Sequence, residues 1–395
     1  MRQYKMVELG TLIHQAKTVR CGEGNYPVLS MTMHDGLVFQ NDKFKKTIAS
    51  KDKSDYKVVK RNQLVISFPI DEGVLAAQRI VDAGIVSPAY GIWDINQEMI
   101  LPEFLECALR CDRALSYYKA KLRGSTARRR SLPTETLLAY TVPLPNISEQ
   151  EHILNVVHKT QKVISSRTKE ISLLDELVKA RFVEMFGDPE INSFDWPVCT
   201  LKELVSIEPQ NGLYKPQSAY VQDGSGFPIV RIDAFYDGRI TNFSALKRLE
   251  CSESEVQRYL LQENDIVINR VNSIEYLGKC AHIKGLLEET VFESNMMRLH
   301  LDDTVMNAVF ATKLLCSQYI YKQIMVRAKK AVNQASINQQ DVLSFRMFVP
   351  PLELQEQFAA FVEQADKSKV AVQKALDEAQ LLFDSLMQKY FGDGN

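Results

Sequence analysis

Val142-Pro143-Leu144-Pro145-Asn146-Ile147-Ser148-Glu149-Gln150 opens a segment that ends in Met185-Phe186-Gly187-Asp188, and the second half of the chain carries another version of it. There, Val349-Pro350-Pro351-Leu352-Glu353-Leu354-Gln355-Glu356-Gln357 opens a segment that ends in Tyr390-Phe391-Gly392-Asp393. The repeat spans about half of the chain, which is too long a period for a solenoid. The sequence therefore predicts two copies of a globular domain, each followed by one long helix.

The prolines of the two junctions mark domain boundaries, because they hold the chain extended where no helix can begin. Acidic residues follow them in the expected first turn of a helix, where they complement the helix dipole. We predict a first domain over residues 1–145 and a first spacer helix over 146–187. A second domain is expected over 188–348 and a second spacer helix over 349–395.

Both spacer segments carry apolar residues in alternating steps of four and three, the spacing of a coiled-coil seam. The first seam runs through Ile153, Val157, Thr160, Ile164, Arg167, Ile171, Leu174, Val178, Arg181 and Met185. The second runs through Phe358, Val362, Ala365, Lys369, Val372, Leu376, Ala379, Phe383, Leu386 and Tyr390. Helices with so narrow an apolar stripe need a partner. We expect the two helices to pair antiparallel, related by an approximate twofold axis.

Each half predicts a mixed α and β domain. Pro27–Met31 and Leu37–Phe39 flank an Asp-Gly turn, and Pro228–Ile232 and Arg239–Ile240 flank another, which predicts a hairpin in each half. The apolar runs Gln63–Phe68 and Asp265–Arg270 suit buried strands. A helix of about 20 residues is expected in each half before the exit, over Pro102–Leu122 and Thr304–Lys330. The predicted fold class is α+β, with two mixed domains and two long antiparallel coiled-coil helices.

The composition is that of an ordinary soluble protein, with 395 residues, 45% hydrophobic and 25% charged. The sequence has no apolar run long enough to span a bilayer and no apolar core of a signal peptide at its start, so we expect a cytoplasmic protein. The seven cysteines include no C-x-x-C pair, and Cys107 and Cys111 are spaced as buried thiols on one helix face. We expect neither a structural metal nor a disulfide.

Positive charge gathers at the same place in both halves, although the net charge is −1. Residues 113–134 hold seven basic residues and no acid, and residues 304–340 hold five basic residues and no acid. Both runs lie just upstream of a proline-rich junction. One explanation is a solvated helix end favoured by the helix dipole. The recurrence favours a surface for a polyanion such as DNA.

Taken together, the duplicated junctions and helix ends resemble the DNA-specificity subunit of a type I restriction-modification system. The resemblance covers the whole chain, and its most specific parts are Glu149-Gln150, Glu356-Gln357 and the two terminal motifs. It implies two target recognition domains that each bind one half of a split, asymmetric target in double-stranded DNA, with the spacer helices fixing the gap. The resemblance implies that this subunit is not itself an enzyme. Its second domain departs from expectation because it is net acidic.

The resemblance also implies partners. Two methyltransferase subunits and restriction-translocase subunits would assemble on this chain and act together as a site-specific DNA methyltransferase and ATP-dependent endonuclease. S-adenosylmethionine, ATP and Mg are then expected on those partners, and no cofactor is expected on this chain.

Basic residues in the acid-free runs are the candidates for phosphate contacts, and polar residues on loops that leave strands are the candidates for base contacts. For phosphate contacts we select Arg123, Arg128, Arg129 and Arg130 in the first domain, with Arg327, Lys329 and Lys330 in the second. For base contacts we select Lys17, Arg20, Arg79, Tyr90, Lys215, Arg270, Asn272, Lys279, Asn333, Gln334 and Ser336.

Two other classes of function remain. A coiled-coil adaptor that binds only proteins would explain the heptads, but not the recurring basic runs. A DNA methyltransferase is suggested by Ser87-Pro88-Ala89-Tyr90, which resembles the target-base loop of amino-methylating enzymes except at its middle residue. Neither Gly22-Glu23-Gly24 nor Gly224-Ser225-Gly226 has the third glycine of a cofactor-binding turn, which argues against catalysis.

Overall fold

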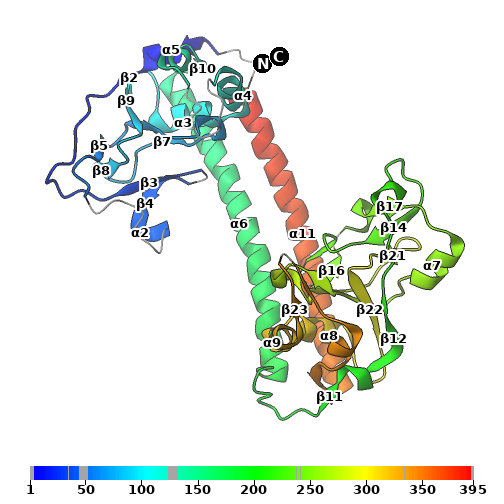
Figure 1. Ribbon diagram of the computed structural model, residues 1–395. Coiled ribbons are helices and arrows are strands. Elements are labelled where there is room, and N and C mark those ends of the chain that lie inside the picture. Colours follow the sequence, from blue (N-terminus) through cyan, green and yellow to red (C-terminus); the bar gives the residue numbers. More distant parts are fainter. Residues whose placement is uncertain are drawn as a thin grey trace. The chain divides into compact units, whose positions relative to one another are not determined.

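The computed structural model describes residues 4–33, 35–43, 52–122, 132–236, 238–240, 242–332 and 334–392 (Figure 1). The chain divides into two compact units. Unit 1 is Met1–Lys169 with Gln373–Asn395, and unit 2 is Glu170–Val372. Each unit therefore combines one globular domain with the beginning of one long helix and the end of the other.

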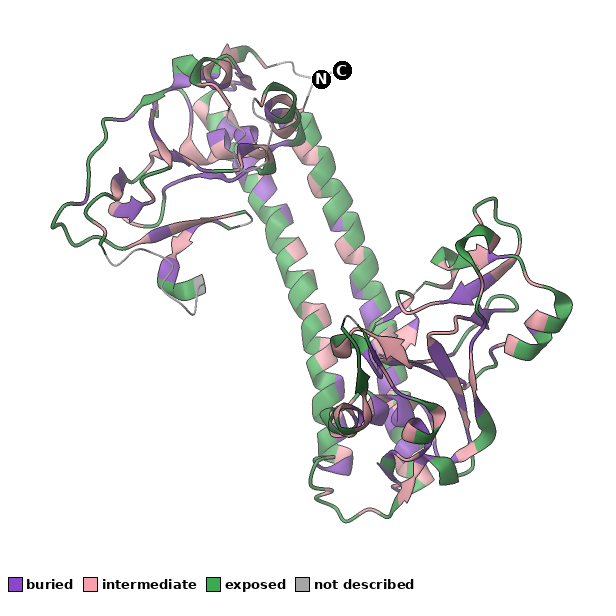
Figure 2. Ribbon diagram, viewed as in Figure 1, coloured by how far each residue is buried: buried purple, intermediate pink, exposed green. Residues whose placement is uncertain are grey.

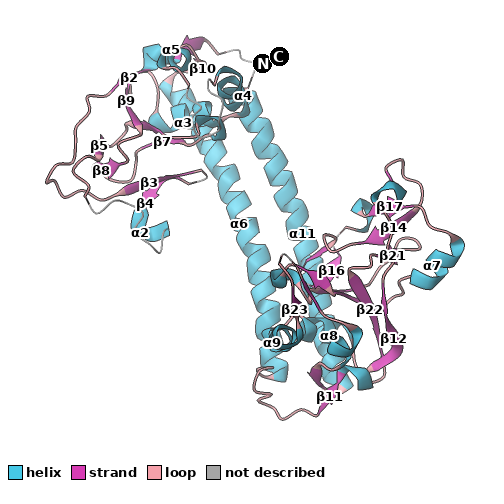
Figure 3. Cartoon of the chain, viewed as in Figure 1, coloured by secondary structure: helices cyan, strands magenta, loops and turns pink. Residues whose placement is uncertain are grey.

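Unit 1 is built around an antiparallel sheet of four strands in the order β2-β9-β6-β7, of which β2, β9 and β7 are labelled in Figure 3. Three antiparallel pairs, β1–β10, β3–β4 and β5–β8, complete its strands. The strands are β1 (Met6–Glu8), β2 (Ile13–Gln15), β3 (Leu29–Thr32), β4 (Gly36–Phe39), β5 (Lys57–Lys60), β6 (Leu64–Ile66), β7 (Leu75–Ala77), β8 (Ala83–Val86), β9 (Gly91–Ile95) and β10 (Thr141–Pro143).

Unit 2 contains a six-stranded sheet in the order β12-β22-β18-β20-β16-β15 and a four-stranded sheet in the order β13-β17-β14-β21. A three-stranded sheet, β19-β24-β23, and the pair β11–β25 complete it. The strands are β11 (Val198–Thr200), β12 (Val205–Asn211), β13 (Tyr220–Val221), β14 (Phe227–Val230), β15 (Phe235–Tyr236), β16 (Gly238–Ile240), β17 (Lys247–Leu249), β18 (Ile266–Asn269), β19 (Val271–Asn272), β20 (Cys280–His282), β21 (Val291–Phe292), β22 (Met296–Leu301), β23 (Lys329–Lys330), β24 (Ala335–Ser336) and β25 (Arg346–Phe348).

The internal repeat is visible in the order of the strands. In unit 1 the central order is β2-β9-β6-β7, and in unit 2 the strands in the corresponding places are β12-β22-β18-β20. The predicted buried strands, β6 and β18, hold the same place in the two sheets. The α+β fold class and its two mixed domains are confirmed.

The single long helix predicted before each exit is wrong, because both helices are broken. In unit 1, α3 (Pro102–Arg110) ends at Cys111, whose backbone is extended, before α4 (Asp112–Lys121) begins. In unit 2, α8 (Ala308–Leu315) is separated from α9 (Gln318–Arg327) by an extended Ser317, whose hydroxyl accepts the backbone N–H of Ile320. Cys107 and Cys111 therefore do not share one helix face.

The remaining helices are short, apart from the two spacer helices. They are α1 (Leu9–Leu12), α2 (Gln40–Lys43), α5 (Thr134–Leu138), α7 (Glu253–Tyr259) and α10 (Gln339–Leu343), with 3-10 turns η1 (Ile70–Glu72), η3 (Leu201–Glu203), η4 (Gln217–Ala219), η5 (Phe243–Ala245) and η6 (Ile274–Tyr276).

The first predicted hairpin is confirmed and the second is wrong in its partner. β3 pairs with β4 across a turn that ends at Gly36, where φ is +65°. In unit 2, β14 instead pairs with β17 and β21. The turn itself lies where it was predicted, with Gly238 at φ +85°, but the strand before it is β15, which pairs with β16 in place of the predicted Pro228–Ile232.

The two spacer helices are α6 (Ile147–Phe186) and α11 (Leu352–Phe391). Every residue of the two predicted seams is buried or partly buried (Figure 2). In unit 1 the core joins Ile153 and Val157 of α6 to Phe391 at the end of α11. In unit 2 it joins Phe182 of α6 to Phe358 at the start of α11. The predicted antiparallel pairing of the helices is therefore confirmed within each unit.

The structure corrects the alignment of the two junction motifs. The helices begin at Ile147 and Leu352, so Gln150 corresponds to Gln355 and not to Gln357. Both Gln150 and Gln355 are fully buried. Each junction contains two prolines, Pro143 and Pro145 in the first and Pro350 and Pro351 in the second. The junctions can therefore be aligned in more than one way from the sequence, including the way that matches Gln150 with Gln357.

All seven cysteines are free thiols. Burial raises the pKa of Cys107 to about 12, which keeps its thiol protonated. Among the described residues, no cluster of three or more histidines, cysteines or acids is arranged to hold a metal ion. None of the helices in the described part of the chain has the length and apolar character that crossing a bilayer requires.

Candidate nucleic-acid interface

A small sheet in unit 2 gathers most of the residues predicted for DNA contact in the second domain. β24 lies at its centre and pairs with β19 on one side and β23 on the other. The predicted residues on it or beside it are Arg270, Asn272, Lys329, Lys330, Gln334 and Ser336. They come from two stretches of the chain that lie far apart in the sequence, and backbone pairing brings the stretches together.

The outer edge of this sheet is positively charged and exposed. Helix α9 ends at Arg327, and the chain then forms the two-residue strand β23, in which Lys329 and Lys330 are both exposed. Between β23 and β24, Val332 is 99% exposed. An exposed apolar side chain suits contact with a base edge or with the methyl group of thymine. The two exposed lysines beside it suit contact with phosphates.

An aromatic and cationic pair lies next to the small sheet. Tyr276, at the end of η6, is 54% exposed. The ammonium of Lys279 lies 5.8 Å from the centre of the Tyr276 ring and 5.5 Å from that of Phe235. Such cation–π contacts hold a lysine in a defined direction. Sequence reasoning selected Lys279 and missed Tyr276, although an exposed aromatic between two buried strands was a readable signal.

Glycine allows the loop with Tyr276 to close against the domain. Gly278 has φ +78°, and a Cβ atom there would lie 2.1 Å from a side-chain carbon of Ile324 on α9. The corresponding loop of unit 1 also has a 3-10 turn, η1, followed by a glycine at positive φ, Gly73. It exposes Phe68, at 58%. The two domains therefore present an aromatic from an equivalent loop.

Several predicted residues are already engaged within unit 2. The guanidinium of Arg327 donates to the Ser344 hydroxyl at 2.8 Å and lies over the ring of Phe345. Arg270 donates to the carbonyl of Ser294 at 2.9 Å. The structure thus places both arginines in contacts that support the loops, next to the exposed lysines.

Lys215 lies away from the small sheet, in a contact with Glu255. Its ammonium is 2.8 Å from a carboxylate oxygen of Glu255. This hydrogen bond, together with those from Ser252, lowers the pKa of Glu255 to about 2. The pair joins the loop before β13 to helix α7.

In unit 1, Arg20 and Tyr90 are linked through Lys57. Arg20 forms a backbone bridge with Lys57 and an ion pair with Asp55. The ammonium of Lys57 donates to the carbonyl of Tyr90 at 2.7 Å. Lys17, in the loop between β2 and Arg20, is exposed. Lys57 therefore brings Arg20 and Tyr90 together, and Lys17 lies three residues before Arg20 in the sequence.

Arg79 does not join that group. It forms ion pairs with Glu103 and Glu106 of α3 instead. Arg123, Arg128, Arg129, Arg130 and Asn333, which were also predicted, lie outside the described residues.

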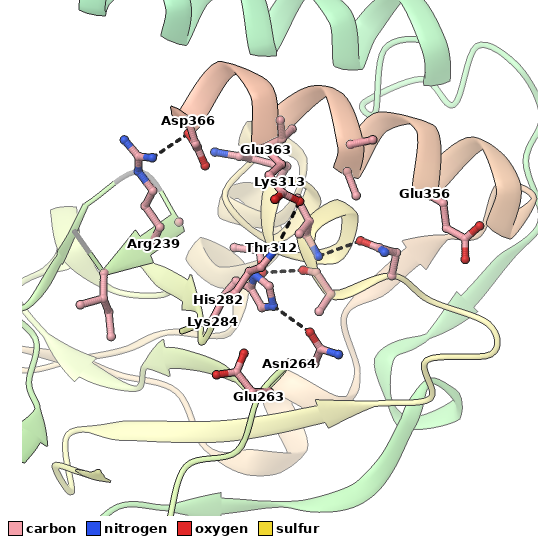
Figure 4. A pocket seen from close by; sticks show the side chains of 18 of the residues that line it. Arg239, Glu263, Asn264, His282, Lys284, Thr312, Lys313, Glu356, Glu363 and Asp366 are labelled. Atoms are coloured by element: carbon pink, nitrogen blue, oxygen red, sulfur yellow. Dashed lines mark hydrogen bonds and ion pairs between the residues drawn. The ribbon is translucent and has the colours of Figure 1, made fainter. Parts of the chain in front are cut away.

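A cavity of about 940 Å³ lies elsewhere in unit 2, between the strands β16 and β20, the start of α8 and one face of α11 (Figure 4). Its charged residues have both signs and are paired across it. Arg239 is 2.8 Å from Asp366, and Lys284 is 3.2 Å from Glu363. Because these charges neutralise one another, the cavity has no excess of positive charge for DNA.

His282 lines this cavity, and its Nε2 atom lies 3.2 Å from the side-chain oxygen of Asn264 (Figure 4). An amide oxygen can only accept, so the Nε2 atom of His282 carries the proton and donates. Burial, followed by the ammonium of Lys284, lowers the pKa of His282 to about 4. The imidazole is therefore neutral at neutral pH.

Residues 194–379 match the family model of the type I restriction modification DNA specificity domain. They contain the small sheet, Tyr276 and Lys279. Most of the matched residues lie in unit 2, which is therefore similar to a type I restriction-modification DNA specificity domain. The resemblance that the duplicated motifs predicted is confirmed by this match and by curated relatives.

The putative type I restriction enzyme MjaX specificity subunit of Methanocaldococcus jannaschii is 30% identical over 217 residues, which are 53% of this chain and 49% of the relative. The EcoKI specificity subunit of Escherichia coli K12 is 25% identical over 268 residues, 63% of this chain and 56% of the relative. The chain thus spans about half the length of the curated relatives that it matches.

Solved structures of the same class share the fold of the specificity domain and of the rest of the chain. The S subunit of the type I restriction-modification system from M. genitalium aligns with a TM-score of 0.59 at 15% identity, over 99% of this chain and 97% of that one. A structure described as the basis of complex assembly and conformational transition of the type I system aligns with a TM-score of 0.56 at 17% identity, over 100% and 98%.

Proposed function

We propose that this chain is the DNA-specificity subunit of a type I restriction-modification complex. It binds double-stranded DNA at a bipartite target and directs the methyltransferase and restriction subunits to it. The observation that carries this proposal is the small sheet of unit 2, where exposed lysines, an exposed aromatic and polar side chains lie together inside the matched specificity domain.

The two domains should read different half-sites. Unit 2 offers Lys329 and Lys330 on β23 and Tyr276 in the loop with η6, whereas the loop of unit 1 that corresponds to the η6 loop offers Phe68. Different side chains in equivalent places recognise different base edges. The target is therefore asymmetric, and each domain supplies one half of it.

The chain works with partner subunits in this proposal. Two methyltransferase subunits and restriction-translocase subunits assemble on it, and they bind S-adenosylmethionine, ATP and Mg. The chain itself binds no cofactor and performs no catalytic step. Its contribution is to place the DNA, because phosphate contacts fix position and base contacts fix sequence.

The experiment is a binding assay with the chain assembled with its methyltransferase subunits, on random duplexes at rising salt. The complex should select a bipartite sequence, and its affinity should fall steeply as salt displaces the phosphate contacts. In the double variant Lys329→Gln/Lys330→Gln, binding to all sequences should weaken, and the salt slope should fall by about one for each lysine in contact with phosphate.

Lys374→Gln provides the matched control, because it removes an exposed lysine from α11, which is not part of the small sheet. It should leave affinity and salt slope unchanged. A protein-binding adaptor would show no complex that depends on DNA sequence and salt. That result would overturn the proposed function.

A further inference from the structure

Lys369 is a charged residue buried in the apolar seam of α11. It is 5% exposed, and its neighbours on the seam, Ala365 and Val372, are buried as well. Lysine is almost never buried without a partner, because taking its ammonium out of water costs more than packing its stem returns. The partners of Lys369 therefore indicate its role.

Those partners form a chain of charges inside unit 2. The ammonium of Lys369 pairs with Asp175 on α6 and lies 3.7 Å from Asp366 on its own helix. Asp366 is in turn 2.8 Å from the guanidinium of Arg239 on β16 (Figure 4). The six-stranded sheet, α11 and α6 are thus joined by one ionic network.

The two residues of the described helices that are equivalent to Lys369 and Asp175 in unit 1 do not form such an ion pair. Counted from the two helix starts, Ile164 of α6 corresponds to Lys369, and Gln380 of α11 corresponds to Asp175. Gln380 donates to Asp384 in its own helix at 2.9 Å. The duplicated helices therefore differ at this position, where one copy has an apolar side chain and the other a buried cation.

A buried cation can fix the register of two paired helices, whereas apolar residues alone allow more than one register. Leucine, valine and alanine seams can slide by one heptad, because similar side chains meet again. If α6 slid by a heptad along α11, Thr168 or Phe182 would face Lys369 in place of Asp175. Neither can neutralise an ammonium, so the displaced register would remove the Asp175 carboxylate and leave the buried ammonium only the more distant Asp366 of its own helix, which is destabilising.

We propose that Lys369, through Asp175, sets the register of α6 against α11 and is thereby a positioning residue for the spacing of the recognised half-sites. The proposal rests on the proposed function, since the register matters for recognition only if the helices fix the gap between half-sites. Asp366 and Arg239 extend the same constraint to the sheet of unit 2.

The test compares methylation of duplexes that carry both half-sites separated by a series of spacers, using the assembled complex. Wild type should prefer one spacer length by about tenfold or more, which corresponds to about 1.4 kcal/mol. The double variant Lys369→Leu/Asp175→Leu should reduce that preference to about threefold or less, because an apolar seam tolerates more than one register. Its thermal unfolding midpoint should stay equal or rise, since apolar replacement of a buried ion pair is often stabilising.

Lys374→Gln/Glu378→Gln is the control, because it removes an exposed lysine and acid pair from the same helix. It should keep the wild-type spacer preference, as should Lys369→Arg, which keeps the charge. Lys369→Gln gives a second variant, for which the same loss of preference is expected. If Lys369→Leu/Asp175→Leu and Lys369→Gln both prefer one spacer length as sharply as wild type does, the proposal is overturned. It is also overturned if both variants fail to fold, because Lys369 would then serve stability alone. If wild type selects no bipartite target, the proposed function fails instead.

Discussion

Gln150 and Gln355 make the same three hydrogen bonds, each in its own unit. The side-chain oxygen of Gln150 accepts the backbone N–H of Leu101 at 2.8 Å, and its nitrogen donates to the carbonyls of Met99 and Pro145 at 2.9 Å each. Gln355 accepts from Asn307 at 2.9 Å and donates to Val305 at 3.1 Å and Pro350 at 2.8 Å. A single buried amide thus ties the start of each spacer helix to the backbone just before α3 in unit 1 and just before α8 in unit 2.

Gln150→Leu should destabilise unit 1, because three buried backbone groups lose their partner. Buried groups left unsatisfied cost roughly 1–3 kcal/mol each, with partial relief from relaxation, so we expect a loss of about 2–4 kcal/mol. Urea unfolding of the full chain measures it. Gln161→Leu, at an exposed position of α6, should change stability by less than about 0.5 kcal/mol. Equal effects of the two substitutions would contradict the role given to Gln150.

Phe391→Ala should loosen unit 1 and leave unit 2 intact. Phe391 is fully buried, its ring lies 5.0 Å from that of Phe104, and its carbonyl accepts from Arg113. Removing a buried phenylalanine costs about 3–5 kcal/mol. Hydrogen exchange should accelerate in α3 and α4 and stay unchanged in α8 and α9. Leu381→Ala, at a position that is 72% exposed, should have no such effect.

Tyr276→Ala should weaken DNA binding by the assembled complex by about tenfold, because the ring both offers an exposed aromatic face and holds Lys279. Tyr276→Phe should bind normally, since the ring is kept. Tyr214→Ala removes another exposed tyrosine of unit 2, at 77% exposed, and should bind as wild type. Fluorescence anisotropy at fixed salt measures all three. If Tyr276→Ala and Tyr214→Ala behaved alike, Tyr276 would have no part in the interface.

The stability of unit 2 should decrease between neutral and mildly acidic pH because of His282. Its folded pKa, about 4, is lower than its ordinary value of 6.5, so the unfolded chain binds the proton first as pH falls. Lys284 lowers this pKa and Glu263 and Asp303 raise it. The stability that the neutral imidazole contributes is complete above about pH 6.5 and is lost as pH falls towards 4.

Urea unfolding at pH 7 and pH 5 tests this dependence. Wild type should lose on the order of 1–2 kcal/mol more than His282→Gln between the two values. Glutamine keeps a donor for Asn264 and does not titrate. An identical pH dependence in the two proteins would show that His282 is not responsible.

Lengthening one spacer helix by a turn, about 5.4 Å, should widen the gap between the recognised half-sites by one or two base pairs. The half-sites themselves should not change, because the insertion leaves both domains untouched. Mapping of methylated positions in the host genome reads out both at once. Selection of the original gap after the insertion would mean that the helices do not set the spacing.

The sequence alone determined the features that depend on local periodicity. A seam in steps of four and three requires a long helix with a partner, and both α6 and α11 formed with that seam buried. Apolar runs gave the buried strands β6 and β18, and the duplicated motifs gave the repeat and the family. Lys369 was also visible on the seam, but its charge had no explanation there.

Tertiary structure decided the features that depend on which distant segments meet. It broke the two predicted helices at Cys111 and Ser317, moved the second hairpin to β15 and β16, and matched Gln150 with Gln355. It assembled β19, β24 and β23 into one sheet, placed Tyr276 beside Lys279, and gave Lys369 its partner Asp175. The physical reason is that strand pairing and burial of a charge are stabilised by contacts between residues far apart in the chain, which leave no period in the sequence.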